Sequence, residues 1–122
     1  MPTKSILIVD DSISMRKMVE FTLQESGYQV ETSENGQIAL HKLADTQFDL
    51  ILADMNMPIM DGLSFVREAR KTTAYRFTPI LMLTTENSND KIQAGREAGA
   101  TGWLIKPFEP AKLLSTVKKV LA

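Results

Sequence analysis

The chain has 122 residues, 43% of them hydrophobic and 24% charged, as is typical of one globular domain with a single core. Its 14 basic and 15 acidic residues leave a net charge of −1, and it has no cysteine and one histidine, His41, so we expect no nucleic-acid partner and neither a thiolate nor a multi-histidine metal site. No apolar run approaches the ~18–20 residues of a membrane span, and residues 1–4 lead directly into the first predicted strand without room for a signal peptide, so we expect a cytoplasmic protein with no membrane partner.

Strand-like and helical segments alternate along the chain. Short apolar runs predict five strands, over residues 5–10, 30–33, 50–54, 80–84 and 103–105. Apolar residues at helical spacing predict a helix after each strand, around residues 15–23, 38–43, 63–69, 89–98 and 113–121. This alternation predicts an α/β fold, a doubly wound five-stranded parallel sheet with helices on both faces. We expect a single domain over residues 1–122, without an output domain.

Capping and turn residues mark the boundaries of these segments. Ser12 and Ser14 are candidate N-caps of the first helix, Gly27 ends it, and Asn35-Gly36 is a turn signal. The helix over 89–98 is the weakest prediction, because few of its residues are apolar and Gly95 lies inside it. An interior glycine costs roughly 1 kcal/mol relative to alanine, so we expect this helix to yield at low cost.

Four of the predicted strands lead into a residue with chemical function. Asp10-Asp11 follow the first strand, Asp54 ends the third, Thr84 ends the fourth, and Lys106 follows the fifth. If the strands are parallel, these side chains meet at one edge of the sheet, the edge where open α/β sheets bind ligands. A single aspartate there would be read as a loop cap, but four strand ends with complementary chemistry favour a functional site.

Three carboxylates at one edge need positive charge. Two carboxylates ~5 Å apart repel by about 3 kcal/mol at an effective dielectric constant near 20, and one lysine cannot balance three. A hard divalent cation with oxygen ligands and open positions for water, Mg²⁺ rather than Ca²⁺, suits the site. The cation and Lys106 would hold a phosphoryl group while Asp54 attacks phosphorus to give an aspartyl phosphate.

As a set, these residues resemble the receiver domain of two-component response regulators, and more narrowly the stand-alone chemotaxis receivers of the CheY type. The motifs that carry the resemblance are Asp10-Asp11, Asp54 with Asn56-Met57-Pro58, Asp61-Gly62, Thr84 and Lys106-Pro107-Phe108. The resemblance spans essentially the whole chain, and it implies a flavodoxin-like fold with strand order 2-1-3-4-5, the order of CheY and flavodoxin themselves.

The resemblance implies a phosphoacceptor and a metal site. Asp54 matches the phosphoacceptor. Asp11 matches a direct Mg²⁺ ligand, Asp10 helps to hold the metal, and Asn56 supplies its backbone carbonyl, so the implied metal set is Asp10, Asp11, Asp54 and Asn56.

The resemblance also implies the residues that respond to phosphorylation. Lys106 pairs with the phosphoryl group and Thr84 turns its hydroxyl toward it, while Trp103 is the aromatic switch residue that moves with Thr84. The Lys106–Pro107 bond is expected to be cis, and Asn56 and Glu86 are expected to tune how fast the phosphate is lost.

The implied function is a phosphorylation-activated signalling module, not an enzyme beyond its own phosphorylation and dephosphorylation. It would take its phosphoryl group from a histidine kinase and act as a monomer by binding a protein target. A chemotaxis protein acting on the flagellar motor switch is the favoured version, and a phosphate sink or phosphorelay intermediate is the alternative.

Two other classes of function are weaker hypotheses. A metal-dependent phosphatase with an aspartyl intermediate generally needs a second aspartate two residues after the nucleophile, where this chain has Asn56. A nucleotide- or flavin-binding module would need a loop that cradles phosphate, but the first strand leads into Asp10-Asp11-Ser12, without glycine.

Overall fold

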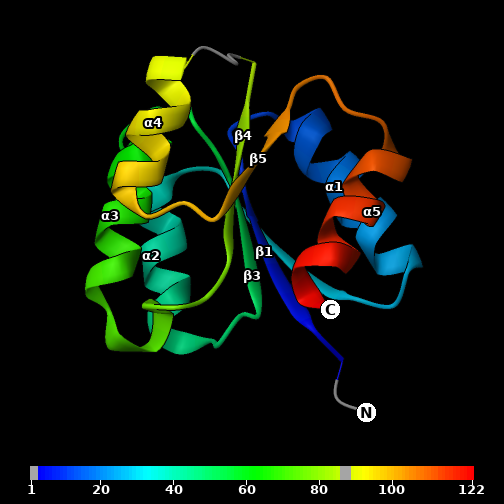
Figure 1. Ribbon diagram of the computed structural model, residues 1–122. Helices are drawn as coiled ribbons and strands as arrows, with labels where there is room; N and C mark the ends of the chain where they lie inside the picture. The colour runs from blue at the N-terminus through cyan, green and yellow to red at the C-terminus, as the bar shows by residue number, and fades with distance from the viewer. Residues whose placement is uncertain (1–2, 86–88) are drawn as a thin grey trace.

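The computed structural model describes residues 3–85 and 89–122, in which five parallel strands form one sheet (Figure 1). The strands are β1 (Ser5–Val9), β2 (Gln29–Ser33), β3 (Leu50–Asp54), β4 (Ile80–Thr84) and β5 (Gly102–Ile105). Their order is β2-β1-β3-β4-β5, which confirms the predicted fold class and strand order.

Helices cover both faces of the sheet (Figure 1). One face carries α1 (Ile13–Glu25) and α5 (Pro110–Leu121), and the other carries α2 (Gly36–Asp45), α3 (Gly62–Lys71) and α4 (Asn89–Ala98). A short 3₁₀ helix, η1 (Thr73–Tyr75), lies between α3 and β4, where the sequence analysis predicted neither a helix nor a strand. The alternating order of strands and helices therefore produces the doubly wound architecture.

The apolar runs become strands because the sheet is buried on both faces. Every residue of β3 and β4 is buried, as expected of central strands in a parallel sheet. In β1, Leu7 and Val9 pack with residues of α2 and α3, while Ile6 and Ile8 pack with residues of α1 and α5. The period of two along a strand thus divides the core into two layers.

The observed boundaries differ from the predicted ones in small ways. β1 ends at Val9, and β2 and β5 begin one residue early, at Gln29 and Gly102, because backbone pairing rather than apolar character sets the limit of a strand. Ser12 caps α1 as predicted. Asn35 proves to be the N-cap of α2, its side chain accepting a hydrogen bond from the backbone N–H of Ile38 at 2.9 Å.

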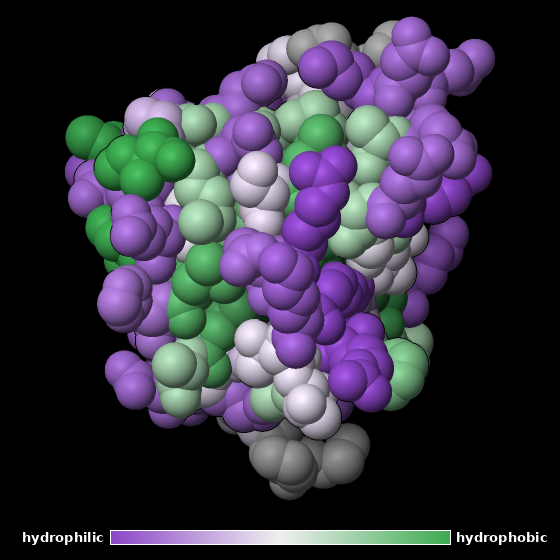
Figure 2. All heavy atoms as spheres, turned by 90° about the vertical axis from the view of Figure 1, so that its left-hand side faces the viewer, coloured by the Kyte–Doolittle hydropathy of each residue, from purple (hydrophilic) through white to green (hydrophobic). Residues whose placement is uncertain are grey.

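The outer face over α2, α3 and α4 is mostly hydrophilic, with apolar residues reaching the surface in several separate places (Figure 2). Within residues 3–85 and 89–122, no helix combines the length and apolar character needed to cross a membrane.

Candidate phosphoryl-transfer site

The strand order places the predicted site residues at the carboxyl edge of the sheet. β1 and β3 are neighbours, with Val9 opposite Ala53, so Asp10 and Asp54 leave adjacent strands side by side. β4 and β5 continue the sheet, with Thr84 opposite Ile105, the residue before Lys106. The connections from β1 and β3 run to opposite faces of the sheet, so the site lies at the topological switch point where doubly wound folds bind their ligands.

Three carboxylates converge at this point. One oxygen from each of Asp10, Asp11 and Asp54 lies within 4.8 Å of the other two. Asp10 and Asp54 are buried, at 0% and 6% exposed, whereas Asp11 is exposed. The cluster therefore has one side open to solvent, through which a cation or a phosphoryl donor can reach it.

Lys106 supplies positive charge to the cluster. Its Nζ donates to Asp10 Oδ2 at 2.8 Å and to Asp54 Oδ1 at 3.2 Å. The Lys106–Pro107 peptide bond is cis, which confirms the prediction made from the resemblance. One ammonium group is thus shared between two buried carboxylates.

Burial and neighbouring charges shift the pKa values of Asp54 and Lys106. Burial, and then the charge of Asp10, raises the pKa of Asp54, while Lys106 and a hydrogen bond from the Asn56 backbone N–H act to lower it. Burial acts to lower the pKa of Lys106, but its hydrogen bonds and charge interactions with Asp10 and Asp54 leave that pKa raised. Both groups hold their protons more tightly than usual, so the cluster favours additional positive charge.

Local structure holds Asp10 in place. Its Oδ1 accepts a hydrogen bond from the Ser12 backbone N–H at 2.9 Å, and its backbone carbonyl accepts one from Arg16 Nη1 at 2.7 Å. Ser12 in turn accepts from the Met15 backbone N–H at 3.2 Å as the cap of α1. The start of α1 therefore orients one Asp10 oxygen, which leaves the other directed at Lys106.

The Asp61-Gly62 motif has a separate structural cause. Asp61 is the N-cap of α3 and accepts a hydrogen bond from the Ser64 backbone N–H at 2.8 Å. A Cβ at Gly62 would lie 2.3 Å from the backbone oxygen of Asp54, and the Gly62 N–H donates to the Met55 carbonyl at 2.9 Å. Only glycine lets α3 begin this close to the end of β3, so the motif sets the position of the Asp54 backbone.

The sequence does not predict the conformation of the loop between β3 and α3. Ile59 has φ 71° and is 75% exposed, and the Met60 N–H donates to the Pro58 carbonyl at 2.7 Å across it. This three-residue turn is strained for a β-branched residue. The motif Met57-Pro58-Ile59 contains no glycine or asparagine at that position, so no turn signal identified it.

Thr84 is buried, 1% exposed, at the end of β4. Its hydroxyl is directed at the sulfur of Met55, with 3.9 Å between Oγ1 and Sδ. Met55 directly follows Asp54 in the chain, so the Thr84 hydroxyl lies near the end of β3. The sequence did not identify Met55 as a partner of Thr84.

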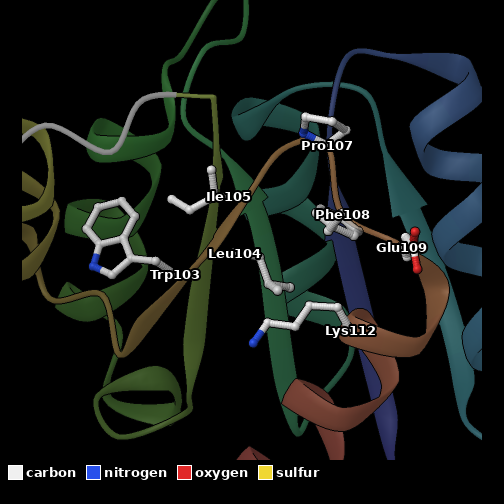
Figure 3. Close-up of a pocket in the computed structure, with 7 residues that line it drawn as sticks. All are labelled: Trp103, Leu104, Ile105, Pro107, Phe108, Glu109 and Lys112. Atoms are coloured by element: carbon white, nitrogen blue, oxygen red, sulfur yellow. The ribbon is translucent and has the colours of Figure 1, made fainter.

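Trp103 lies further back on β5, opposite Met82 of β4, and its indole packs against Gly95 of α4. A hollow of about 460 Å³ is lined by residues of β5, of the segment that follows it, and by Lys112 of α5. Figure 3 shows Trp103 to one side of the other lining residues. Trp103 thus contacts α4 and also borders this hollow. Glu86, which the resemblance implicates in phosphate loss, lies outside the described residues.

Fold and site together define a doubly wound α/β domain with an acidic cluster and a lysine at its switch point. The chain belongs to the response regulator receiver domain family, which matches residues 6–118. It is therefore a receiver domain of a two-component system, as the motifs indicated.

Relatives of known identity include both stand-alone and longer proteins. The chain is 36% identical to the chemotaxis protein CheY1 of Helicobacter pylori over 95% of both chains. It is also 36% identical to the transcriptional regulatory protein ResD of Bacillus subtilis, over 95% of this chain but only 47% of ResD. The chain thus spans about half the length of ResD and nearly all of CheY1.

Solved structures give the same result. The structure of the chemotaxis protein CheY4 of Vibrio cholerae has a TM-score of 0.96 and 53% sequence identity, covering 98% of this chain and 100% of that one. A DrrB receiver domain activated with BeF3 has a TM-score of 0.89 and 29% identity, covering 98% of both chains.

Proposed function

We propose that Asp54 accepts a phosphoryl group from a histidine kinase and that the phosphorylated chain signals by binding a protein target. The observation that supports this most directly is the convergence of Asp10, Asp11 and Asp54 within 4.8 Å, with Lys106 bonded to two of them. No other residue set in the described ranges combines an accessible carboxylate cluster with a shared ammonium group.

The proposed step is an in-line displacement. A carboxylate oxygen of Asp54 forms a bond to phosphorus while the phosphorus–nitrogen bond of a phosphohistidine breaks, and the electron pair of that bond stays with the imidazole nitrogen. The imidazole takes up a proton and leaves as a neutral ring. Asp54 needs no general base, because an ionised carboxylate is already a nucleophile. Lys106 lies where it can pair with an oxygen of the transferred group.

The donor set fits Mg²⁺. Three carboxylates, one of them exposed, offer hard oxygen ligands while leaving positions for water and phosphoryl oxygens. Asp10, Asp11 and Asp54, with the backbone carbonyl of Asn56, would hold the ion. When bound, Mg²⁺ would neutralise charge on the phosphoryl oxygens during transfer. After burial, the charge of Asp10 raises the pKa of Asp54, and this repulsion supports a site that binds a further cation.

We further propose a role in chemotaxis, in the cytoplasm, with the flagellar motor switch as the target. The relatives CheY1 of H. pylori and CheY4 of V. cholerae, both named as chemotaxis proteins, support this version. A phosphate sink or relay intermediate would share the same site chemistry but would not bind the motor switch.

Incubation with acetyl phosphate and Mg²⁺ tests the site. We expect intact-mass measurement to show one phosphoryl group per chain, absent without Mg²⁺ and absent in Asp54→Asn. Asp45→Asn, an exposed aspartate at the end of α2, is the control and should be labelled like the parent. Asp11→Asn should need more Mg²⁺ for the same labelling. Labelled Asp54→Asn protein, or many turnovers of acetyl phosphate per minute, would contradict the proposal.

A binding measurement tests the target. Purified flagellar motor switch protein should bind the chain more tightly when beryllofluoride and Mg²⁺ are present, and Asp54→Asn should show no such increase. Normal labelling of Asp54 without any increase in binding would favour the phosphate sink or relay.

A further inference from the structure

Helix α4 buries little apolar side chain. Its buried residues are Gly95 and Ala98, and it carries no large apolar residue that is fully buried. An interior glycine weakens a helix relative to alanine, so Gly95 lowers the stability of an element that is already poorly anchored. A glycine at a buried helical position calls for a packing reason.

The Trp103 indole provides that reason. A Cβ placed on Gly95 would lie 2.1 Å from Cη2 and 2.4 Å from Cζ2 of Trp103. These distances are far inside van der Waals contact, so the ring occupies the space that any other side chain at position 95 would fill. We call this space, bounded by the backbone of α4 at Gly95, the Gly95 notch.

The notch receives the outer edge of the ring, and Trp103 lies near Thr84 in the register of the sheet. Trp103 is opposite Met82 on β4, and Thr84 lies two residues further along the same strand, on the same face of the sheet. Thr84 Oγ1 is 3.9 Å from Met55 Sδ in this conformation. The ring seated in the notch therefore coexists with a Thr84 hydroxyl that bonds to Met55.

We propose that the Gly95 notch is a seat that competes with the activated position of Trp103. The proposal rests on the proposed function, in which Thr84 turns toward a phosphoryl group on Asp54 and Trp103 follows it. For that movement the ring edge must leave the notch. The fit of the ring against Gly95 then sets how readily phosphorylation moves Trp103, and glycine at this position is a regulatory feature of α4.

A stability measurement tests the seat without any phosphorylation. On helix propensity alone, Gly95→Ala should raise the urea midpoint. With Trp103 present, we expect it to lower the midpoint, because the added Cβ collides with the ring. In a Trp103→Phe background the colliding indole atoms are absent, and the same substitution should raise the midpoint. If Gly95→Ala fails to fold when Trp103 is present but folds in the Trp103→Phe background, this is the extreme form of the expected result.

Fluorescence of Trp103 tests the direction of the movement. In the Gly95→Ala variant, measured without Mg²⁺ or a phosphoryl donor, we expect acrylamide to quench Trp103 fluorescence less than in the parent. In a separate measurement with Mg²⁺, we expect this variant to bind beryllofluoride roughly fivefold more tightly, which is at the lower end of couplings between linked sites. Gln93→Ala, an exposed change on the same helix, should alter neither quantity. Any of three results for Gly95→Ala would overturn the proposal: a Trp103 ring more open to acrylamide, unchanged Trp103 emission, or a urea midpoint raised equally in the parent and Trp103→Phe backgrounds. If the parent protein fails to bind beryllofluoride, the proposed function is wrong, and the urea midpoints still decide whether the seat exists.

Discussion

Lys106 lies closer to Asp10 than to Asp54, the residue proposed to be phosphorylated. Its Nζ is 2.8 Å from Asp10 Oδ2 and 3.2 Å from Asp54 Oδ1. Asp10 is fully buried and has its other oxygen bonded to the Ser12 backbone N–H. The shorter bond to Asp10 thus anchors the lysine, which holds its ammonium group beside Asp54, the proposed phosphoacceptor.

Removing the lysine should destabilise the protein. Lys106→Met leaves two buried carboxylates without their cation, a change that costs about 3–5 kcal/mol when a buried ion pair loses one partner. We expect urea unfolding in EDTA to show this loss of stability. With saturating Mg²⁺ the loss should be smaller, because the cation replaces the positive charge of the lysine. Lys4→Met, at an exposed position, is the control. An equal loss with and without Mg²⁺ would show that Lys106 acts through packing alone.

Removing a carboxylate should have the opposite effect. Asp54 is buried beside Asp10, and repulsion between the two contributes to its raised pKa. Asp54→Asn keeps the size of the side chain and deletes one negative charge, so we expect a higher Tm than the parent in EDTA. The difference should shrink or reverse in Mg²⁺, which binds the parent more tightly. A lower Tm in EDTA would mean that the bond from Lys106 outweighs the repulsion.

The sheet could be predicted because its strands have a simple physical signature. β3 and β4 are buried on both faces, so they read as uninterrupted apolar runs that end at Asp54 and Thr84. The helix η1 was missed because it is one turn long. Asn35 was taken as a turn residue because the same side-chain bond to backbone that makes a turn also caps a helix.

The site could be predicted because parallel strands bring their ends together, which requires only the strand order and no side-chain detail. The partnership of Gly95 and Trp103 could not be predicted in the same way. This contact between α4 and β5 depends on how one indole ring fits against the helix backbone. From the sequence alone, Gly95 could be recognised only as a residue that destabilises the helix. The bond from Thr84 to Met55 likewise depends on a contact across two strands.

Arg70 joins α3 to the segments on either side of β4. Its guanidinium donates to the Gly99 carbonyl at 2.9 and 3.0 Å, to the Tyr75 carbonyl at 2.7 Å and to the Thr78 carbonyl at 2.6 Å. Arg70→Met should lower the free energy of unfolding by about 2–3 kcal/mol, because partly buried carbonyls lose a charged donor. Arg70→Lys should recover little of the lost stability, since one ammonium group cannot make the several hydrogen bonds that the planar guanidinium makes. Urea unfolding measures both, with exposed Arg67→Met as the control, and full recovery by lysine would contradict the assignment.

Tyr75 should make the stability of the folded protein depend on pH in the alkaline range. The fully buried phenol accepts a hydrogen bond from the Phe48 backbone N–H at 3.1 Å and donates to the Thr46 carbonyl. Burial raises its pKa above the ordinary 10.0, with a smaller contribution from Asp49 and opposed by the Phe48 bond. A raised pKa in the folded state stabilises the fold fully below the unfolded pKa, and this stability is lost as pH rises toward the folded pKa.

Tyr75→Phe should therefore affect stability differently at the two ends of the pH range. At pH 7 we expect a loss of about 1–2 kcal/mol, from unpaired backbone groups at Thr46 and Phe48. Above pH 10 the loss should shrink, because phenylalanine has no proton for the unfolded chain to release. Urea unfolding from pH 7 to 11 measures the difference, and a constant difference would show that Tyr75 does not ionise on unfolding in this range.

Thr84 should transmit phosphorylation to Trp103 through its hydroxyl. The phosphoryl group adds charge and acceptor oxygens beside Thr84, which can draw the hydroxyl away from Met55 Sδ. Because Trp103 is the only tryptophan in the chain, its fluorescence should change when beryllofluoride and Mg²⁺ are added. We expect that change to be absent in Asp54→Asn and strongly reduced in Thr84→Ala, while Thr84→Ser, which keeps the hydroxyl, retains most of it. A full response from a Thr84→Ala protein that is labelled normally on Asp54 would show that the signal reaches Trp103 by another route. Equal losses in the alanine and serine variants would assign the coupling to the methyl group and to packing, because serine differs from threonine only there.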